Sequence, residues 1–527
     1  MKQPIIAVSH LTVRSDDQLL LDNVTLEIYE GEITLLVGRS GSGKTVFMKI
    51  LAGLITPANT HFKISGSIKV GGKEILGATL LPNRQATPIG IVFQDYGLMD
   101  NYSIAQNFDF AFAHSPFHIP REQRQNVAAR LQQKLGLDYR LPIRHASGGQ
   151  KRRIAIARTL AYNPEIIIYD EPTAGLDPQM MRTVASLIHD THAAFSKKSS
   201  IVVTHQYVDF LPFANRVLFL DPAQKTISEV SPANLEQQLS REESPTSAPP
   251  KSKWWCDLGG QVTTFFAKTA GWAWRSVVLV MTLLVRLIPY WRSPLWGLRY
   301  FGHYLRLVSF FSAIFYIGMA GIIVGFVGAY FTFKFMPYAQ YTRPLITEDV
   351  LSALGYGLYR IIIPISVSVL VAARCGAAVT SDLGNRIYLQ EIDAMQSLGA
   401  SPSRYLQTGV VYAFLIGMPV LTLIAFFLAR LMCLWVFLFM HPQHNAIFAD
   451  AIFHSFLRQG GELFFKGSSW VICKALVCGF GIGNICYLIG MRPKSSTRDI
   501  SRDITLSVIW GTLFVLMTHL VFALLEF

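Results

Sequence analysis

The sequence predicts an α/β domain joined to an all-α, polytopic membrane domain, and two patterns lead to this division. In residues 1–240, short apolar runs alternate with longer, charged, helix-like stretches, an order typical of a mostly parallel sheet covered by helices. After residue 253, apolar stretches reach the length needed to span a bilayer. The composition agrees, since 51 % of the 527 residues are hydrophobic and only 15 % are charged.

The first domain contains five runs that predict strands. They are Ile33–Val37, Ile89–Phe93, Ile166–Tyr169, Ile201–Val203 and Val217–Leu220. Residues 241–253, REESPTSAPPKSK, have the composition of a flexible linker. We therefore place the end of the first domain at residue 240.

Five later stretches predict membrane-spanning helices. They cover residues 307–333, 351–381, 405–439, 467–491 and 504–526. The stretch Ser276–Trp291 is shorter and is interrupted by Arg286 and Pro289, which favours a helix lying in the membrane interface. The predicted organisation is therefore an interfacial, amphipathic segment at 254–306 and a membrane domain at 307–527.

Two glycine pairs in the spans predict close helix packing. The motifs Gly321-x-x-x-Gly325 and Gly479-x-x-x-Gly483 let helix backbones approach each other. Because glycine is common in membrane spans, we interpret both pairs as packing positions rather than as a site.

Basic residues are concentrated in the membrane half. Residues 1–245 carry a net charge of +2 and residues 246–527 one of +11, which favours anionic lipid over nucleic acid as a partner. Met1–His10 lacks the pattern of a signal peptide, so we expect the first domain to be cytoplasmic. Five spans then place loops 382–404 and 492–503 inside, and the basic second loop satisfies the positive-inside rule.

A glycine-rich loop follows the first predicted strand, with the sequence GRSGSGKT and the pattern G-x-x-x-x-G-K-[ST]. In such a loop, backbone N–H groups curl around phosphates, and the following helix offers its positive N-terminus. Lys44 would hold the β- and γ-phosphates, and Thr45 would ligate Mg²⁺. The predicted nucleotide-binding residues of this loop are Gly38, Arg39, Ser40, Gly41, Ser42, Gly43, Lys44 and Thr45.

Two carboxylates end the strand-like run Ile166–Glu171. Asp170 can orient Mg²⁺, and Glu171 can polarise the water that attacks the γ-phosphate. Between the two motifs lies Ser147-Gly148-Gly149-Gln150. With these motifs in this order, nearly all of residues 4–235 resemble the ATPase subunits of ABC transporters, of the MlaF type.

The resemblance implies ATP hydrolysis and assigns further residues. Ser147, Gly148, Gly149 and Gln150 resemble the signature motif, and Asp177 lies in a segment like the D-loop. Gln94 resembles the Q-loop glutamine, a further Mg²⁺ ligand, and His205 the switch histidine, so that Gln94, Glu171 and His205 are the expected catalytic set. In this family the signature motif completes the nucleotide site of the opposite subunit. One such domain per chain therefore implies a homodimer.

One departure from the family concerns the adenine base. The segment Leu11–Ser15 lacks the aromatic residue that family members stack on adenine. Val13 is the nearest apolar candidate for this contact, which leaves the selectivity for the base open.

The most informative segment of the second half runs from Ala372 to Pro402. Its parts Ala372-Ala373-Arg374-Cys375-Gly376, Asp382-Leu383-Gly384 and Leu398-Gly399-Ala400-Ser401-Pro402 resemble the central block of MlaE-type permeases of Mla and Mce lipid transport systems. The similarity is strong over 355–415 and weaker over 467–515. It implies a phospholipid substrate, a periplasmic ring of Mce-domain proteins, a small cytosolic STAS-domain regulator and a place in the inner membrane of a two-membrane envelope.

A short amphipathic helix is predicted within the loop that follows residue 381. Tyr388, Ile392 and Met395 recur at helical spacing, and Glu391 and Asp393 supply an acidic face. Such a coupling helix is suited to a groove of the ATPase domain, where the acidic face would meet basic residues. The alternative is a helix that lies on lipid.

Four basic residues, Arg360, Arg374, Arg430 and Lys474, fall inside predicted spans. We expect no acidic residue within the spans to neutralise them. Relatives carry an Arg-Glu pair where this chain has Arg360-Ile361, so we expect no ion pair at that point either. We hypothesise that Arg360 and Lys474 face a central cavity and bind a lipid phosphate. Snorkelling toward the interface is the alternative for Arg374 and Arg430.

Together these features predict a fused ATPase–permease half-transporter that uses ATP and Mg²⁺ and moves phospholipid as a homodimer. Two alternatives stay open. One is an ABC transporter of another hydrophobic solute, such as a sterol or hopanoid, and the other is a non-transporting, ATP-driven gate or scaffold. The sequence leaves open the transport direction, the lipid class and the identity of the partners.

Overall fold

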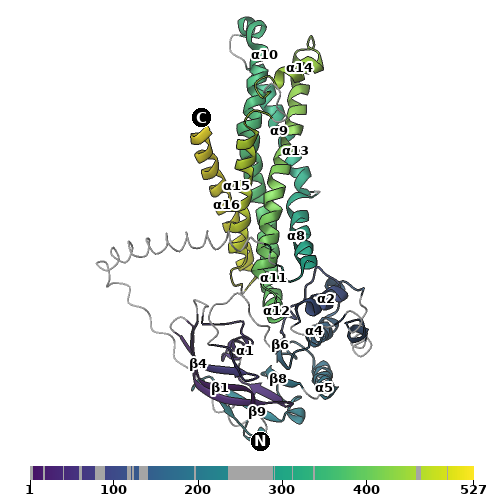
Figure 1. Cartoon of the computed structure of the whole chain (residues 1–527), viewed down its shortest axis with the longest axis vertical. Helices are drawn as coiled ribbons and strands as arrows, with labels where there is room; N and C mark the ends of the chain where they lie inside the picture. The colour runs from purple at the N-terminus through teal and green to yellow at the C-terminus, as the bar shows by residue number, and fades with distance from the viewer. Residues whose placement is uncertain are drawn as a thin grey trace, which may run out of the picture. The chain divides into compact units, whose positions relative to one another are not determined.

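The structure is a computed structural model in which the chain forms two compact units (Figure 1). Unit 1 comprises Met1–Arg275 with Leu389–Ser401, and unit 2 comprises Ser276–Tyr388 with Pro402–Phe527. The structure describes residues 4–15, 18–39, 41–57, 62–76, 89–115, 120, 124–129, 140–194, 198–235, 289, 291–310, 312–335, 339–458, 465–494 and 496–526. The predicted linker 241–253, nearly all of the predicted interfacial helix Ser276–Trp291, and Ser40 lie outside these residues.

A six-stranded sheet forms the centre of unit 1, in the order β10-β9-β3-β8-β7-β6. All neighbours from β9 to β6 are parallel, and β10 is antiparallel to β9. The strands are β3 (Ile33–Val37), β6 (Ile89–Val92), β7 (Ile166–Asp170), β8 (Ser199–Thr204), β9 (Arg216–Asp221) and β10 (Thr226–Glu229). The five predicted strands are confirmed, because a strand of a parallel sheet is buried on both faces and reads as an unbroken apolar run.

A four-stranded antiparallel sheet completes unit 1, in the order β2-β1-β4-β5. Its strands are β1 (Pro4–Ser15), β2 (Gln18–Tyr29), β4 (Phe62–Val70) and β5 (Lys73–Glu74). β1 and β2 precede the first predicted strand and show mixed buried and exposed positions rather than an apolar run. The described helices of unit 1 are α1 (Lys44–Leu51), α2 (Ile104–His114), α4 (Gly148–Tyr162), α5 (Pro178–Ala194) and α12 (Glu391–Ser397).

Unit 2 is a bundle of helices that run side by side (Figure 1). Its elements are α8 (Pro294–Ser309), α9 (Ser312–Lys334), α10 (Ala339–Gly357), the π-helical turn η4 (Leu358–Ile362), α11 (Ile363–Tyr388), the π-helical turn η5 (Ser403–Gln407), α13 (Thr408–Met440), α14 (Ala446–Phe453), α15 (Ser468–Gly490) and α16 (Thr497–Glu526). Within the described residues, five helical segments are long and apolar enough to cross a membrane, which confirms the predicted multi-pass domain. The first begins at Pro294, inside the segment expected at the interface, and its helix α8 carries the buried residues Trp296 and Tyr300.

Helix α13 is the central element of this bundle and packs on α8, α9, α11 and α15. Both predicted glycine pairs face it. A Cβ on Gly321 would lie 2.5 Å from the carbonyl oxygen of Ala425, and one on Gly479 would lie 2.7 Å from that of Phe414. The interpretation of these glycines as packing positions is confirmed, since a larger residue would push α9 or α15 away from α13.

Candidate functional site

The glycine-rich loop joins β3 to α1. Because β3 lies between β8 and β9, the loop leaves the middle of the parallel sheet at the carboxyl ends of its strands. Gly41 and Gly43 have φ angles of 80° and 105°, a conformation that favours glycine. A Cβ on Gly38 would lie 3.1 Å from the carbonyl oxygen of Leu220, so the loop approaches β9 closely here.

Three predicted site residues form a series of polar contacts beside the loop. The Lys44 ammonium donates to two carbonyl oxygens of its own loop, at 2.6 and 2.7 Å, and lies 3.9 Å from Oε1 of Glu171. The other carboxylate oxygen of Glu171 lies 2.8 Å from Nδ1 of His205. Burial lowers the pKa of Lys44, while the carboxylates of Glu171 and Asp170 oppose that shift. The structure thus brings Lys44, Glu171 and His205 together.

Glu171 follows β7 in an unusual backbone conformation. Its φ of 44° is rare for a residue other than glycine. The N–H of Glu171 donates to the carbonyl oxygen of Val203 on β8 at 2.8 Å, which holds this conformation in place. Backbone strain of this kind concentrates at functional sites, where it fixes the direction of a side chain.

Asp170, the last residue of β7, is 2 % exposed, and within the described part of the chain its Oδ1 has no hydrogen-bond donor. Burial, together with the neighbouring charge of Glu171, raises the pKa of Asp170 to about 6. A buried carboxylate oxygen without a donor fits a hard cation such as Mg²⁺, which takes oxygen ligands. Thr45 and Gln94 are exposed, so their side-chain oxygens are accessible to the same ligand.

The tetrad Ser147 to Gln150 begins α4. The Ser147 hydroxyl accepts from the N–H of Gln150 at 3.3 Å, and the Gln150 side chain accepts from the N–H of Ser147 at 2.8 Å, forming a capping box. Asp177 similarly begins α5, because its Oδ1 accepts from two backbone N–H groups at 3.1 and 3.0 Å. Ser147, Gly148 and Asp177 are exposed, so both predicted motifs lie on the surface of unit 1.

Val13 does not take the place of the missing aromatic residue. It is fully buried within β1, opposite Leu21 on β2 and Ile64 on β4. Successive side chains of a strand point to opposite faces, so Val13 points into the core and Arg14 is exposed. The expectation that Val13 is available to a nucleotide base is wrong.

Helix α12 lies in unit 1, where Oδ2 of Asp393 is 2.7 Å from Nζ of Lys49 on α1. Asp393 thus meets a basic residue of the first domain, as its place on an acidic face predicts. Met395 is fully buried and Ile392 nearly so. Sequence reasoning missed Lys49, although it follows Lys44 by five residues on the phosphate-loop helix.

Two other residues of the predicted coupling helix depart from the expectation. Tyr388 is the last residue of α11 and belongs to unit 2, because Gln390, with a φ of 56°, interrupts the helix before α12 begins. The prediction that Tyr388 shares one helical face with Ile392 and Met395 is therefore wrong. Glu391 is 3 % exposed, so it is a buried residue rather than part of an exposed acidic face.

In unit 2, Arg360 and Lys474 share one carboxylate, that of Glu526 at the end of α16. Nε of Arg360 donates to Oε1 of Glu526 at 2.6 Å, and the Lys474 ammonium pairs with Oε2. The expectation that no acid within the spans neutralises these cations is wrong, since the fold brings the end of α16 to residues far away in sequence. The available signal was Glu526 itself, the one acidic residue in the predicted span 504–526.

The other two basic residues of the spans have different partners. Arg430 pairs at 2.9 Å with Asp450 on α14, beyond the end of its own span. Arg374 donates to the hydroxyl of Ser312 at the start of α9. The snorkelling alternative for Arg374 and Arg430 stays a prediction.

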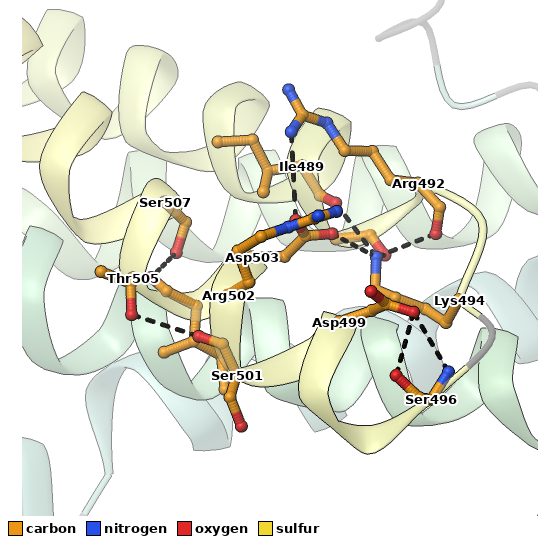
Figure 2. Close-up of polar contacts among 12 residues, drawn as sticks. Ile489, Arg492, Lys494, Ser496, Asp499, Ser501, Arg502, Asp503, Thr505 and Ser507 are labelled. Carbon is orange, nitrogen blue, oxygen red and sulfur yellow. Dashed lines mark hydrogen bonds and ion pairs between the residues drawn. The ribbon is translucent and has the colours of Figure 1, made fainter. Parts of the chain in front are cut away.

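A further ion cluster lies where α15 ends and α16 begins (Figure 2). The buried Lys494 ammonium donates to the carbonyl oxygens of Gly490 and Arg492, at 3.2 and 2.8 Å, and lies 2.7 Å from Oδ2 of Asp503. Lys494 therefore caps the carboxyl end of α15. The largely exposed Arg492 and Arg502 approach Asp503 at 3.9 and 3.8 Å.

Two family models match separate parts of the chain. The model described as ABC transporter matches residues 21–174, and the one described as Permease MlaE matches residues 308–525. These matches agree with the sequence resemblance in both halves.

Known proteins match the first half. The arginine transport ATP-binding protein ArtM of Bacillus subtilis (strain 168) is 34 % identical over 225 residues, which are 41 % of this chain and 88 % of that protein. The sulfate/thiosulfate import ATP-binding protein CysA of Mesostigma viride is 32 % identical over 214 residues, 40 % of this chain and 58 % of that protein. The dimeric structure of a post-hydrolysis state of the ATP-binding cassette MJ0796 bound to ADP and Pi has 26 % identity and a TM-score of 0.36, covering 43 % of this chain and 98 % of its own.

Proposed function

Since the chain belongs to the ABC transporters and joins an ABC-type ATPase domain to an MlaE permease domain, we propose that it is an ATP-driven transporter of phospholipid. The observation that carries the proposal is the net positive charge that the buried Arg360 and Lys474 keep after sharing the single carboxylate of Glu526, in a bundle of apolar spans. Charged residues within membrane spans are costly and are retained where they bind a substrate or partner. A phosphate headgroup with acyl chains has the matching chemistry, because its charge needs cations and its chains need an apolar wall.

The residues around the glycine-rich loop have proposed roles in ATP hydrolysis. Glu171 polarises the attacking water. His205, whose Nδ1 lies 2.8 Å from the Glu171 carboxylate, orients that carboxylate. Lys44 binds the phosphates once its ammonium gives up its hydrogen bonds to the carbonyl oxygens of Gly38 and Arg39. Asp170, Thr45 and Gln94 would hold Mg²⁺, which supplies positive charge beside the phosphates.

The ATPase works, in this proposal, only when two copies of the chain meet. Ser147, Gly148, Gly149 and Gln150 begin a helix at the surface, and in the family such a tetrad completes the site of the opposite copy. Asp177 is exposed as well and lies at the same kind of surface. A homodimer with two-fold symmetry is the simplest assembly that satisfies both sites.

Coupling runs through α12. Asp393 is paired with Lys49 on the helix that begins with Lys44, and Met395 is buried in unit 1. A change at the phosphates moves α1, and α12 transmits that movement to the residues on either side of it, which belong to unit 2.

The proposed setting is an inner membrane with the ATPase domain in the cytoplasm. The MlaE family suggests a periplasmic ring of Mce-domain proteins and a cytosolic STAS-domain regulator as partners. The transport of another hydrophobic solute, and a non-transporting gate, are the competing functions.

Native mass spectrometry of the full chain in detergent, with lipid extraction from the same sample, tests the proposal. We expect two chains that carry one or two phospholipids through detergent exchange. Glu171→Gln should keep this lipid and lower ATP hydrolysis by about 100-fold or more. A retained sterol or hopanoid would support the competing solute. A dimer that retains no lipid, and whose rate of ATP hydrolysis does not change when phospholipid is added, would support the non-transporting gate.

A further inference from the structure

Three charged side chains from distant parts of unit 2 meet at one point, and ATP chemistry uses none of them. Arg360 comes from η4, Lys474 from α15 and Glu526 from the end of α16. Both cations pair with the same carboxylate, and the Lys474 ammonium also donates to the backbone carbonyl oxygen of Arg360 at 3.2 Å. We call these three residues the charged triad.

The charged triad is built into the bundle rather than placed on its surface. Arg360 is 8 % exposed, Lys474 is 3 % exposed, and the Glu526 side chain is fully buried. The Arg360 guanidinium also donates to the Tyr356 hydroxyl and lies over the Tyr356 ring. Gly467, with a φ of 83°, leaves room for Arg360, because a Cβ there would lie 2.8 Å from Nε of Arg360. The site is therefore ordered before any ligand arrives.

The formal charges of the triad sum to +1, because two cations face one carboxylate. Within the described residues, the Lys474 ammonium donates to two acceptors, and an ammonium has three N–H groups. One donor thus remains for an oxygen of a ligand. Ile361 and Ile472, on the elements that carry Arg360 and Lys474, are 40 % and 42 % exposed, so these elements also present apolar side chains at the surface of unit 2.

We propose that Glu526 sets the charge of the lipid headgroup that the triad accepts. With Glu526 in place, the triad matches a phosphodiester with a single negative charge, as in phosphatidylglycerol. Without that carboxylate it would match a phosphomonoester with two negative charges, as in phosphatidic acid. Glu526 is thus a specificity-determining residue, and this role rests on the proposed function, in which Arg360 and Lys474 receive the headgroup.

The experiment compares two lipids that differ only in headgroup. The full chain is loaded at pH 8 with equal amounts of dioleoyl phosphatidylglycerol and dioleoyl phosphatidic acid, and native mass spectrometry measures the retained ratio. We expect the unmodified chain to favour phosphatidylglycerol. Glu526→Gln, which raises the triad to a formal +2, should shift the ratio about 10-fold toward phosphatidic acid.

A charge-restoring variant protects the test against a folding defect. Glu526→Gln combined with Lys474→Gln returns the triad to +1 and should recover the preference for phosphatidylglycerol. Asp450→Asn, which removes the carboxylate beside Arg430, should leave the ratio unchanged, because that pair lies elsewhere in the bundle.

The possible failures are distinct. If Glu526→Gln leaves the ratio unchanged while Arg360→Ala reduces retention of both lipids, the role of Glu526 is overturned and the headgroup site survives. If Arg360→Ala and Lys474→Ala leave the retention of both lipids unchanged, the headgroup site is overturned as well.

Discussion

The ammonium of Lys49 lies 2.7 Å from the carboxylate of Asp393, and this pair joins the helix of the phosphate loop to α12. The charge of Lys49 also opposes the raised pKa of Asp170, the buried carboxylate proposed to hold Mg²⁺. One lysine therefore interacts with a carboxylate of the nucleotide site and with the segment that continues on both sides into unit 2.

Replacing Asp393 with Asn should impair coupling more than stability. The two side chains are 24 % and 32 % exposed, so the pair contributes only about 0.5–1 kcal/mol to the free energy of unfolding. We expect ATP-dependent lipid release from vesicles to fall several-fold, while the unfolding temperature changes little. Lys49→Asp combined with Asp393→Lys should recover part of the release. Asp100→Asn, in the comparable pair with Lys151, is the matched control, and equal losses in both variants would contradict the role.

Asp170 should make the nucleotide-free protein less stable as the pH rises. Its folded pKa of about 6 lies above the value of about 3.9 in an unfolded chain, so the folded protein holds this proton more tightly. The stabilisation by the protonated form is complete below about pH 4 and is lost as the pH rises through about 6, a difference of about 2 to 3 kcal/mol. Asp170→Asn removes the buried charge and should raise the unfolding temperature at pH 8 in chelator.

The pH profile supplies the control for this prediction. The gain from Asp170→Asn should shrink at pH 5, where the carboxyl of the unmodified chain is mostly protonated. Asp190→Asn, at a largely exposed position on α5, should have no effect at either pH. A gain from Asp170→Asn that is equal at pH 5 and pH 8 would argue against a buried charge.

Gly325 should tolerate no larger side chain at the contact between α9 and α13. A Cβ there would collide with the backbone carbonyl of Ala429, which cannot move aside without shifting α13. Gly325→Ala should therefore cost about 1–3 kcal/mol, measured as a lower unfolding temperature in detergent. Gly328→Ala on the same helix is the control, because its Cβ would lie 3.6 Å from a Leu354 methyl group, an ordinary contact.

Asp503 should be required for the turn between α15 and α16 (Figure 2). The side chains of Lys494 and Asp503 are 0 % and 1 % exposed, so Asp503→Ala leaves a buried ammonium without its carboxylate. The expected loss is about 3–5 kcal/mol in the free energy of unfolding. Lys494→Met with Asp503→Leu should lose less, since no buried charge then stands alone. Similar losses of unfolding free energy in the single and double variants would show that the unpaired ammonium is not the cause of the instability.

Much of the fold and of the ATP site is predictable from sequence because the signals are local. The strands β3, β6, β7, β8 and β9 are short apolar runs, and Lys44 with Thr45 belongs to one continuous motif. The five spans follow from length and hydropathy in the same way. The predictions for Val13 and Tyr388 are wrong for local reasons. Strand alternation turns Val13 into the core, and the turn at Gln390 separates Tyr388 from α12.

The sequence by itself determined the two kinds of domain, the phosphate loop and the presence of buried cations in the spans. Only the tertiary structure decided which charges meet, as in Lys49 with Asp393 and Arg360 with Glu526. The members of the second pair are 166 residues apart in the chain. The patterns that predict strands, helices and motifs extend over a few neighbouring residues. An ion pair between distant residues depends instead on how whole helices pack, and a buried charge is costly unless that packing places an opposite charge beside it.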